Sequence, residues 1–293
     1  MVELMRYAMW PPTFVLAAVG LAACGSNGGA SDDPRVVASV YPLRFIADRI
    51  VGNNAEVVDL TPSGQEPHDI ELTSDQITAS LEADLLLYID EGFQPALEDV
   101  VPDAQGDVID ALDEITGVIE TDGQVDPHFW LDPQRLGQVV QVVPDTLGEV
   151  DSENEDSYRA NAEALGNELF ELDSDFARGL DDCDRRVLVT AHESFGYLAD
   201  RYDLEQIGIA GVDPEAEPSP QRLAEIADLV GEHDVTTIFF EELVSPDVAE
   251  TIADETGATT AALHTLETPP EDGDYFAAMR DNLETLKTAL GCS

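Results

Sequence analysis

The sequence predicts an α/β protein with two lobes, each built on a parallel sheet, that are joined by one long backbone helix. Short apolar runs alternate with helical segments along most of the chain, as expected for the βαβ units of a parallel sheet. The alternation occurs in two sets, and the residues between the sets show no strand pattern. A chain of 293 residues with 43% apolar residues is long and apolar enough to form two cores.

The first 34 residues differ in composition from the rest. The run from Trp10 to Ala23 has no charge and leads into a Leu-Ala-Ala-Cys-Gly motif. Because the run is too short to span a bilayer, it predicts a secretory signal peptide over residues 1–23. The motif resembles the lipobox of bacterial lipoproteins, which implies cleavage before Cys24 and its acylation. The alternative is a disposable signal with an incidental cysteine. Residues 24–34, rich in Gly, Ser and Asp, are expected to form a flexible tether.

The first lobe is predicted over residues 35–145. Its strand-like runs are short, continuous and rich in Val, Leu and Ile, which favours buried parallel strands. These runs are Arg35 to Val40, Ala55 to Leu60 and Ala83 to Ile89, with candidate helices at Leu43 to Val51 and Ser74 to Glu82.

The connecting helix and the second lobe are predicted over residues 146–182 and 183–293. From Ser157 to Leu180 apolar residues recur at three- and four-residue intervals, which predicts a long amphipathic helix. Two later helices have clear starts, since Ser219-Pro220 and Ser245-Pro246 each offer an N-cap hydroxyl followed by a proline at the first helical position. The strands of the second set are predicted at Arg186 to Ala191, Gln206 to Gly211, Val235 to Glu241 and Thr259 to Thr265.

The charge of the chain is strongly negative. Asp and Glu number 62 against 13 Lys and Arg, for a formal net charge of −49. A field of this sign repels nucleic acid and anionic membrane surfaces, so neither is an expected partner. Acidic residues are so common here that their positions carry little information, whereas the five histidines stand out.

Four histidines occupy similar positions in the two sets of elements. Ligands of α/β proteins bind beyond the carboxyl ends of strands, and the loops between the lobes would bring these side chains to one cleft. Four imidazole nitrogens satisfy the tetrahedral preference of zinc, and each needs a neighbouring acceptor that fixes its tautomer. Any one of them taken alone also fits a hydrogen-bonded core or capping residue, and His233, at a helix end, is assigned no function. The predicted ligands are His68, His128, His192 and His264, with Asp69, Asp126, Glu193 and Glu241 as the neighbouring acceptors.

Five motifs, in order along the chain, resemble those of the substrate-binding lipoproteins of ABC importers for zinc and manganese. They are EPHDIELTSDQ, DPHFWLDPQ, TAHESFGYLADRYDL, IFFEELVSPDVAETIADETGA and DYFAAMRDNLETL. The resemblance implies two α/β lobes around a rigid backbone helix with the metal between them, and His68, His128 and His192 as the first three ligands. It also implies an extracytoplasmic, lipid-anchored monomer that delivers its ion to a permease and its ATPase.

The metal preference follows from the third and fourth positions. Manganese members of this family usually carry carboxylates there, whereas this chain has His192 at the third and is expected to use His264 at the fourth, which favours zinc. Manganese stays the alternative. The histidine-rich loop of many zinc members is absent between residues 110 and 125.

Two further predictions concern cysteines and catalysis. An exported chain with Cys183 and Cys292 left after processing favours a disulfide over two free thiols. A zinc hydrolase is the rival function, because Glu193 follows His192 directly, but Gly196 stands where a zincin has its second histidine. A protein that captures the ion without turnover is therefore preferred over an enzyme, and an adhesin without metal dependence is the third alternative.

Overall fold

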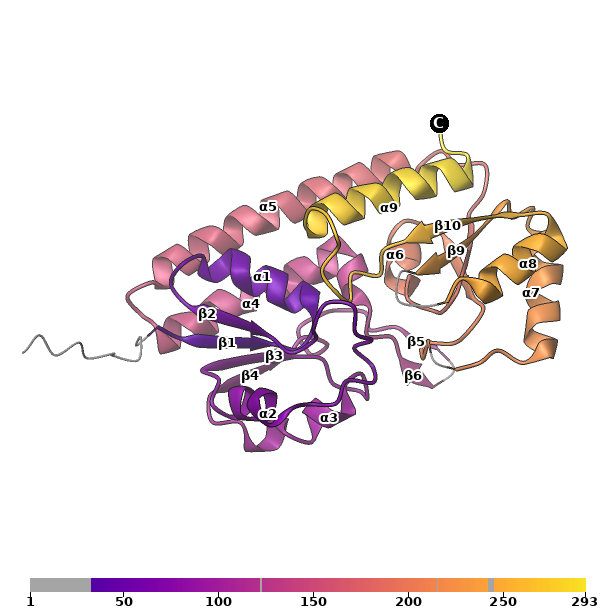
Figure 1. The fold of residues 1–293 in the computed structure, drawn as a ribbon. Coiled ribbons are helices and arrows are strands. Elements are labelled where there is room, and N and C mark those ends of the chain that lie inside the picture. The colour runs from indigo at the N-terminus through magenta and orange to yellow at the C-terminus, as the bar shows by residue number, and fades with distance from the viewer. Residues whose placement is uncertain (1–32, 122, 215, 242–244) are drawn as a thin grey trace, which may run out of the picture. The chain divides into compact units, whose positions relative to one another are not determined.

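The computed structural model describes residues 33–293 apart from 122, 215 and 242–244 (Figure 1). The predicted signal peptide, Cys24 and nearly all of the tether lie outside these residues. The described residues contain two four-stranded parallel sheets and a small antiparallel hairpin, with helices packed around the sheets. The predicted α/β class with two parallel sheets is confirmed.

The first sheet has the strand order β2-β1-β3-β4. Its two central strands are almost entirely buried, as their continuous apolar sequences predict. The fourth strand was not predicted, because in Asp-Val-Ile-Asp two of four residues are acidic and the apolar run is too short to stand out. The elements are β1 (Arg35–Ala38), α1 (Tyr41–Val51), β2 (Glu56–Asp59), α2 (Ser74–Leu81), β3 (Leu85–Tyr88), α3 (Pro95–Glu98), η1 (Val101–Asp103) and β4 (Asp107–Asp110).

A short hairpin leads into the helical region. Strands β5 (Glu120–Thr121) and β6 (Gln124–Val125) pair antiparallel, and the 3-10 helix η2 (Phe129–Leu131) follows. Asp132 then caps α4 (Pro133–Val150), accepting a hydrogen bond from the Gln134 amide at 2.8 Å, and Pro133 occupies the first helical position. The predicted lobe boundary between residues 145 and 146 falls within this helix.

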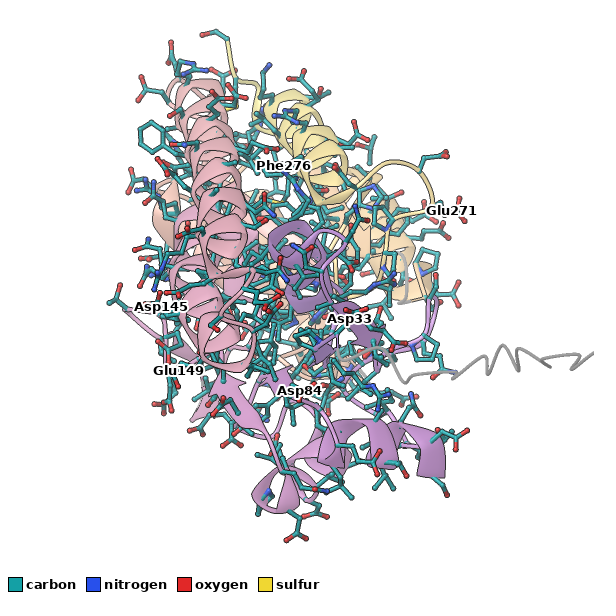
Figure 2. The ribbon with its side chains drawn as sticks, turned by 90° about the vertical axis from the view of Figure 1, so that its left-hand side faces the viewer. Asp33, Asp84, Asp145, Glu149, Glu271 and Phe276 are labelled. Carbon is teal, nitrogen blue, oxygen red and sulfur yellow. A yellow bond between two sulfur atoms is a disulfide. The ribbon has the colours of Figure 1, made fainter. Side chains whose placement is uncertain are left out.

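The predicted long helix is α5 (Glu155–Gly179). Its buried face packs against α4 and α1, and α9 (Tyr275–Leu290) lies beside it (Figure 1). The start of α9, where Phe276 lies (Figure 2), reaches the first lobe. The ring of Phe276 packs edge-on against Phe45 of α1 at 5.7 Å between centroids. The C-terminal helix is thus a second link between the lobes, and one apolar core contains residues of both.

The second sheet has the order β10-β9-β7-β8. Ser219 caps α7 as predicted, its hydroxyl accepting from the Arg222 amide at 3.1 Å. The prediction for Ser245 is wrong by one residue: Pro246 holds the cap position and the Ser245 hydroxyl accepts from Asp247 at 3.3 Å. The elements are β7 (Val187–Thr190), α6 (Gly196–Arg201), β8 (Glu205–Gly208), α7 (Pro220–Glu232), β9 (Thr237–Glu241), α8 (Asp247–Thr256) and β10 (Thr259–Leu263).

The C-terminus is fastened to the start of the second lobe. Cys183 and Cys292 form the disulfide, which closes a loop of 109 residues. In the chain-entropy model a loop of this length contributes about 4–5 kcal/mol at most. None of the helices within the described part of the chain is long and apolar enough to cross a membrane.

Candidate metal centre

Three of the four predicted histidines meet in the structure, together with a glutamate that was not predicted. His68, His128, His192 and Glu267 each place one ligand atom so that all four atoms lie within 4.8 Å of one another. The imidazole of His128 is in the middle, with ring centroids 5.5 Å from His68 and 5.3 Å from His192. His68 lies between β2 and α2 and His128 follows the β5–β6 hairpin, whereas His192 and Glu267 follow β7 and β10, so both lobes contribute.

His128 is fully buried between two carboxylates. Its Nδ1 donates to Asp126 Oδ1 at 2.7 Å and its Nε2 donates to Glu267 Oε1 at 2.9 Å. Burial acts to lower the pKa of His128, but the hydrogen bonds and charges of these two carboxylates together raise it to about 10. In the metal-free protein the ring is therefore an imidazolium, and the proton on its Nε2 lies where a metal ion would bind.

The segment around His128 is fixed by the second lobe. The Tyr197 hydroxyl donates to the Asp126 carbonyl at 2.9 Å, and the Trp130 indole donates to the Thr265 carbonyl at 2.7 Å. A Cβ atom at Gly196 would lie 2.7 Å from Asp126 Oδ2, so a glycine is required for this close approach. The orientation of the His128 ring is thus set from both sides before any ion binds.

His192 follows β7 and is also buried. Its Nδ1 lies 3.1 Å from Glu241 Oε2, and among the described residues its Nε2 is buried without a hydrogen-bond partner. A buried nitrogen with a free lone pair costs stability unless something fills the coordination position. The ring therefore offers one nitrogen to the cluster while a carboxylate faces the other, as in metal-bound histidines.

His68 lies in the loop between β2 and α2. The ring of Phe93 packs edge-on against its imidazole at 4.7 Å between centroids, and its backbone amide donates to Glu66 Oε1 at 3.3 Å. Its Nε2 is 3.5 Å from Glu267 Oε1. Burial lowers the pKa of His68, so the ring is neutral at neutral pH and able to donate a lone pair. Burial also raises the pKa of Glu66 to about 7.

Glu267 is the fourth member of the cluster, where His264 was expected. It follows Leu266, whose φ of 60° is unusual for a residue with a branched side chain and turns the chain back toward the cluster. Its Oε2 accepts from the Thr265 hydroxyl at 3.2 Å, and it is 2% exposed. Despite burial, which acts to raise it, the hydrogen bond from His128 and the nearby ring of His68 hold the pKa of Glu267 well below its ordinary value. The carboxylate is thus ionised.

His264 is not in the group of four. It directly follows β10, and its backbone is bound by Asn282: its amide donates to Asn282 Oδ1 at 2.8 Å, and its carbonyl accepts from Asn282 Nδ2 at 2.8 Å. Strand β10 ends at Leu263, and the chain turns toward the cluster at Leu266. His264 was predicted because histidines are rare in this chain. Glu267 was not predicted because it is one of 62 acidic residues, whose positions carry little information.

The four predicted acceptors lie at different distances from the histidines. Asp126 and Glu241 face His128 and His192, as described above. Asp69 is exposed and lines a cavity of about 330 Å³ that also contains His68 and Phe93. Glu193 lines another cavity, of about 310 Å³. The cavity beside His68 is an opening from solvent toward the cluster.

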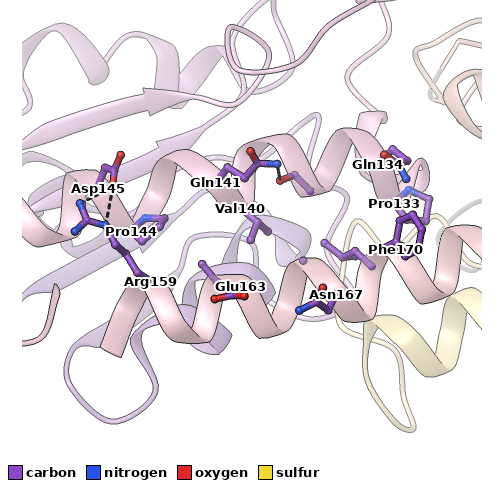
Figure 3. Close-up of a pocket in the computed structure, with 14 residues that line it drawn as sticks. Pro133, Gln134, Val140, Gln141, Pro144, Asp145, Arg159, Glu163, Asn167 and Phe170 are labelled. Carbon is purple, nitrogen blue, oxygen red and sulfur yellow. Dashed lines mark hydrogen bonds and ion pairs between the residues drawn. The ribbon is translucent and has the colours of Figure 1, made fainter. Parts of the chain in front are cut away.

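A larger hollow lies elsewhere. It measures about 580 Å³, runs between α4 and α5, and contains none of the four clustered residues (Figure 3). Phe170, which is 63% exposed, lies at one end, and the Arg159–Asp145 ion pair lies at the other (Figure 3). Of these two cavities, the smaller one is therefore the one that borders the cluster, through His68.

The cluster is suited to hold one divalent cation. Three imidazoles and one carboxylate provide four ligands of the type that zinc binds at about 2.0–2.2 Å in tetrahedral geometry. The ionised Glu267 offsets part of the ion's charge, and His68 borders a cavity of about 330 Å³. A catalytic zinc keeps an open coordination position, whereas four protein ligands close the site.

The chain is similar to proteins that are named as zinc-binding or zinc-uptake proteins. Residues 36–289 match the model of a family described as zinc-uptake complex component A, periplasmic. The zinc-binding protein AdcA of Streptococcus pyogenes serotype M1 is 32% identical over 284 residues, which cover 86% of this chain and 55% of that protein. The high-affinity zinc uptake system protein ZnuA of Bacillus subtilis strain 168 is 32% identical over 314 residues, covering 97% of this chain and 98% of that protein.

Solved structures agree. The laminin-binding protein Lmb of Streptococcus agalactiae, described as having adhesin and metal-transporting activity, superposes with a TM-score of 0.81 at 33% identity, covering 88% of this chain and 99% of that one. The present chain spans about half the length of the AdcA proteins that it matches.

Proposed function

From the premise that this chain belongs to the family of periplasmic zinc-uptake complex components, we propose that it captures a single zinc ion with His68, His128, His192 and Glu267. Members of this family are transport receptors and not enzymes, so the ion is the cargo of the protein. The four-ligand site fits that role, because an ion without an open coordination position is held and not used to activate water.

The observation that supports this proposal is the convergence of four buried ligand atoms from both lobes. His192 Nε2 is buried without a hydrogen-bond partner within the described part of the chain, and His128 Nε2 is held by a proton where a metal would bind. Replacing that proton with Zn²⁺ adds one positive charge to a site that already contains the carboxylates of Asp126 and Glu267, and it gives the orphaned nitrogen a partner. Three imidazoles also favour zinc over manganese, which prefers oxygen ligands.

We also propose how the protein is placed and what it serves. The motif around Cys24 supports cleavage of residues 1–23 and attachment of the mature protein to the outer side of a membrane by lipid. A receptor in that position delivers its ion to a permease and ATPase of the ABC type, acting as a monomer. Labelled lipid incorporation tests the anchor, and incorporation that survives Cys24→Ala contradicts it.

Isothermal titration calorimetry with metal-free protein tests the capture of zinc. We expect one zinc per chain, and we expect Glu267→Gln to weaken binding while the exposed control Glu271→Gln leaves it unchanged. Absence of saturable zinc binding contradicts the proposal. A direct competition with Mn²⁺ tests the manganese alternative, and we expect zinc to displace manganese at equal concentrations.

A further inference from the structure

Each lobe contains a glutamine and threonine pair directly behind a clustered histidine. Gln94 with Thr61 lies behind His68, and Gln206 with Thr190 lies behind His192. We propose that Gln94 and Gln206 are positioning residues for the metal site, which fix the loops that carry the two histidines. This inference rests on the proposed capture of zinc by those histidines.

In the first lobe the pair ties the histidine loop to the ends of two strands. Gln94 is 1% exposed, and its Nε2 is 3.2 Å from each of three acceptors: the Pro67 carbonyl, the Thr61 hydroxyl and the Ser39 carbonyl. The Thr61 hydroxyl donates to the same Ser39 carbonyl at 2.7 Å. Pro67 immediately precedes His68, so this amide restrains the backbone next to the ligand.

The restraint matters because nothing regular holds that loop. No helix or strand occurs between the end of β2 at Asp59 and the start of α2 at Ser74. Phe93, next to Gln94, packs against the His68 ring, so two adjacent residues hold the imidazole and the backbone before it. Phe93 and Gln94 together therefore restrict the His68 side chain to one orientation, although its loop is irregular.

In the second lobe the same chemistry holds the backbone at the histidine itself. Gln206 Nε2, from β8, donates to the Thr190 hydroxyl at 2.8 Å and to the His192 carbonyl at 3.0 Å. The Thr190 hydroxyl donates to that carbonyl at 2.6 Å. His192 lies two residues after the end of β7, and these hydrogen bonds hold its carbonyl against Gln206 of β8.

His128 has no such amide, and its environment explains the difference. Both of its ring nitrogens are already bound by carboxylates, so its orientation does not depend on a fixed backbone carbonyl. His68 and His192 each present a ring nitrogen without a hydrogen bond in the described structure, and these are the two histidines with a glutamine behind them. The glutamines thus supply the restraint that the rings themselves lack.

The test replaces each glutamine with methionine, which is of similar length but has no donor. Loss of outer contacts to a metal ligand typically weakens metal binding by roughly 10–100-fold, and we expect Gln94→Met and Gln206→Met to weaken zinc binding within that range. The matched control is Gln138→Met on α4, whose Oε1 accepts from the Thr116 amide at 2.9 Å, a contact that includes none of the clustered residues. We expect the control to bind zinc like the unmodified protein.

Cobalt(II) gives a readout that a general loss of stability does not change. Its visible absorption reports the geometry of the ligands, and we expect the band of cobalt-loaded Gln94→Met and Gln206→Met to shift while that of Gln138→Met does not. If Gln94→Met does not fold, Gln94→Asn, which keeps the amide but withdraws it by one methylene, serves in its place.

A double-mutant cycle with His68→Ala decides whether Gln94 acts through that histidine. We expect Gln94→Met to have no further effect on zinc affinity in the His68→Ala background. An undiminished effect there, or unchanged affinity and cobalt spectrum in the single variants, overturns the inference. Failure of the unmodified protein to bind zinc would instead overturn the proposed function, so the two failures are distinguishable.

Discussion

His128 and His68 lie side by side in one site, yet they are held in opposite ways. His128 is fully buried, with a carboxylate on each ring nitrogen and neighbours that bind the second lobe. His68 lies on an irregular loop of the first lobe beside a cavity, and its nearest contact across the site is Glu267 at 3.5 Å. Burial acts to lower the pKa of both histidines, but the two carboxylates beside His128 raise its pKa, whereas the pKa of His68 stays lowered.

This difference indicates which part of the site exists before the ion arrives. His128 and Glu267 already form an ion pair across the lobes, so they are a preformed half of the site. His68 borders the opening to solvent and has fewer contacts, so we expect it to be the last ligand to bind an entering ion and the first to leave. One shared core under both lobes makes a wide separation of the lobes costly, which favours release at the loop.

The largest effect is expected for His128→Ala. The substitution removes a ligand and leaves two carboxylates buried without their cation, which typically costs about 3–5 kcal/mol of folding free energy. We expect zinc affinity to fall by roughly 100-fold or more, beyond the effect of losing an outer contact, and the melting temperature of the metal-free protein to fall as well. Calorimetric titration and thermal unfolding check both. A variant that loses affinity without losing stability contradicts the preformed ion pair.

The stability of the metal-free protein is expected to depend on pH through the same pair. The pKa of His128 is about 10 in the folded protein and about 6.5 in the unfolded chain, so its stabilising contribution is complete below 6.5 and is lost as the pH rises toward 10. His68 has the opposite sign: its lowered pKa makes it destabilising as the pH falls below about 6.5.

Denaturant unfolding of the metal-free protein from about pH 5 to about pH 10, a range that includes the pKa values of both histidines, measures how stability changes with pH. We expect the alkaline loss to disappear in His128→Ala and to persist in His68→Ala. Identical alkaline slopes in all three proteins would show that the His128 ion pair does not contribute.

His68→Ala is expected to separate binding from folding. It removes one ligand from a loop and leaves the His128–Glu267 pair intact, so zinc affinity should fall by roughly tenfold to 100-fold while the melting temperature of the metal-free protein stays the same. Stopped-flow mixing with a chelator should show faster release of zinc. Equal losses of stability in His68→Ala and His128→Ala would contradict the difference between the two histidines.

The smallest effect is expected for His264→Ala. The side chain is not among the four clustered residues, and the contacts of its backbone with Asn282 remain in the variant. We expect zinc affinity within about twofold of the unmodified protein, a range typical of substitutions away from the features that a site depends on. A loss as large as that of Glu267→Gln would show that His264 also binds the ion.

The sequence predicted the fold well where its physical signals are strong. Buried strands such as β3, with four consecutive apolar residues, and α5, with its helical repeat, could be read directly. Strand β4 was missed because half of its residues are acidic, and the role of α9 in reaching the first lobe follows from tertiary packing that periodicity does not encode.

The candidate site was predicted in the same uneven way. His68, His128 and His192 could be selected because histidine is rare in this chain and follows strands. Glu267 could not, since its place depends on the left-handed Leu266, and no glycine or asparagine marks that turn in the sequence. The pairing of Gln94 with Thr61 likewise joins residues 33 positions apart through the sheet topology.

A crystal structure of the zinc-loaded protein, with anomalous data collected on both sides of the zinc absorption edge, tests most directly whether these residues bind the ion. We expect one strong peak bonded to His68, His128, His192 and Glu267, with His128 Nδ1 still donating to Asp126. A peak outside this cluster, or one bonded to His264 with Glu267 turned away, would contradict the proposed site.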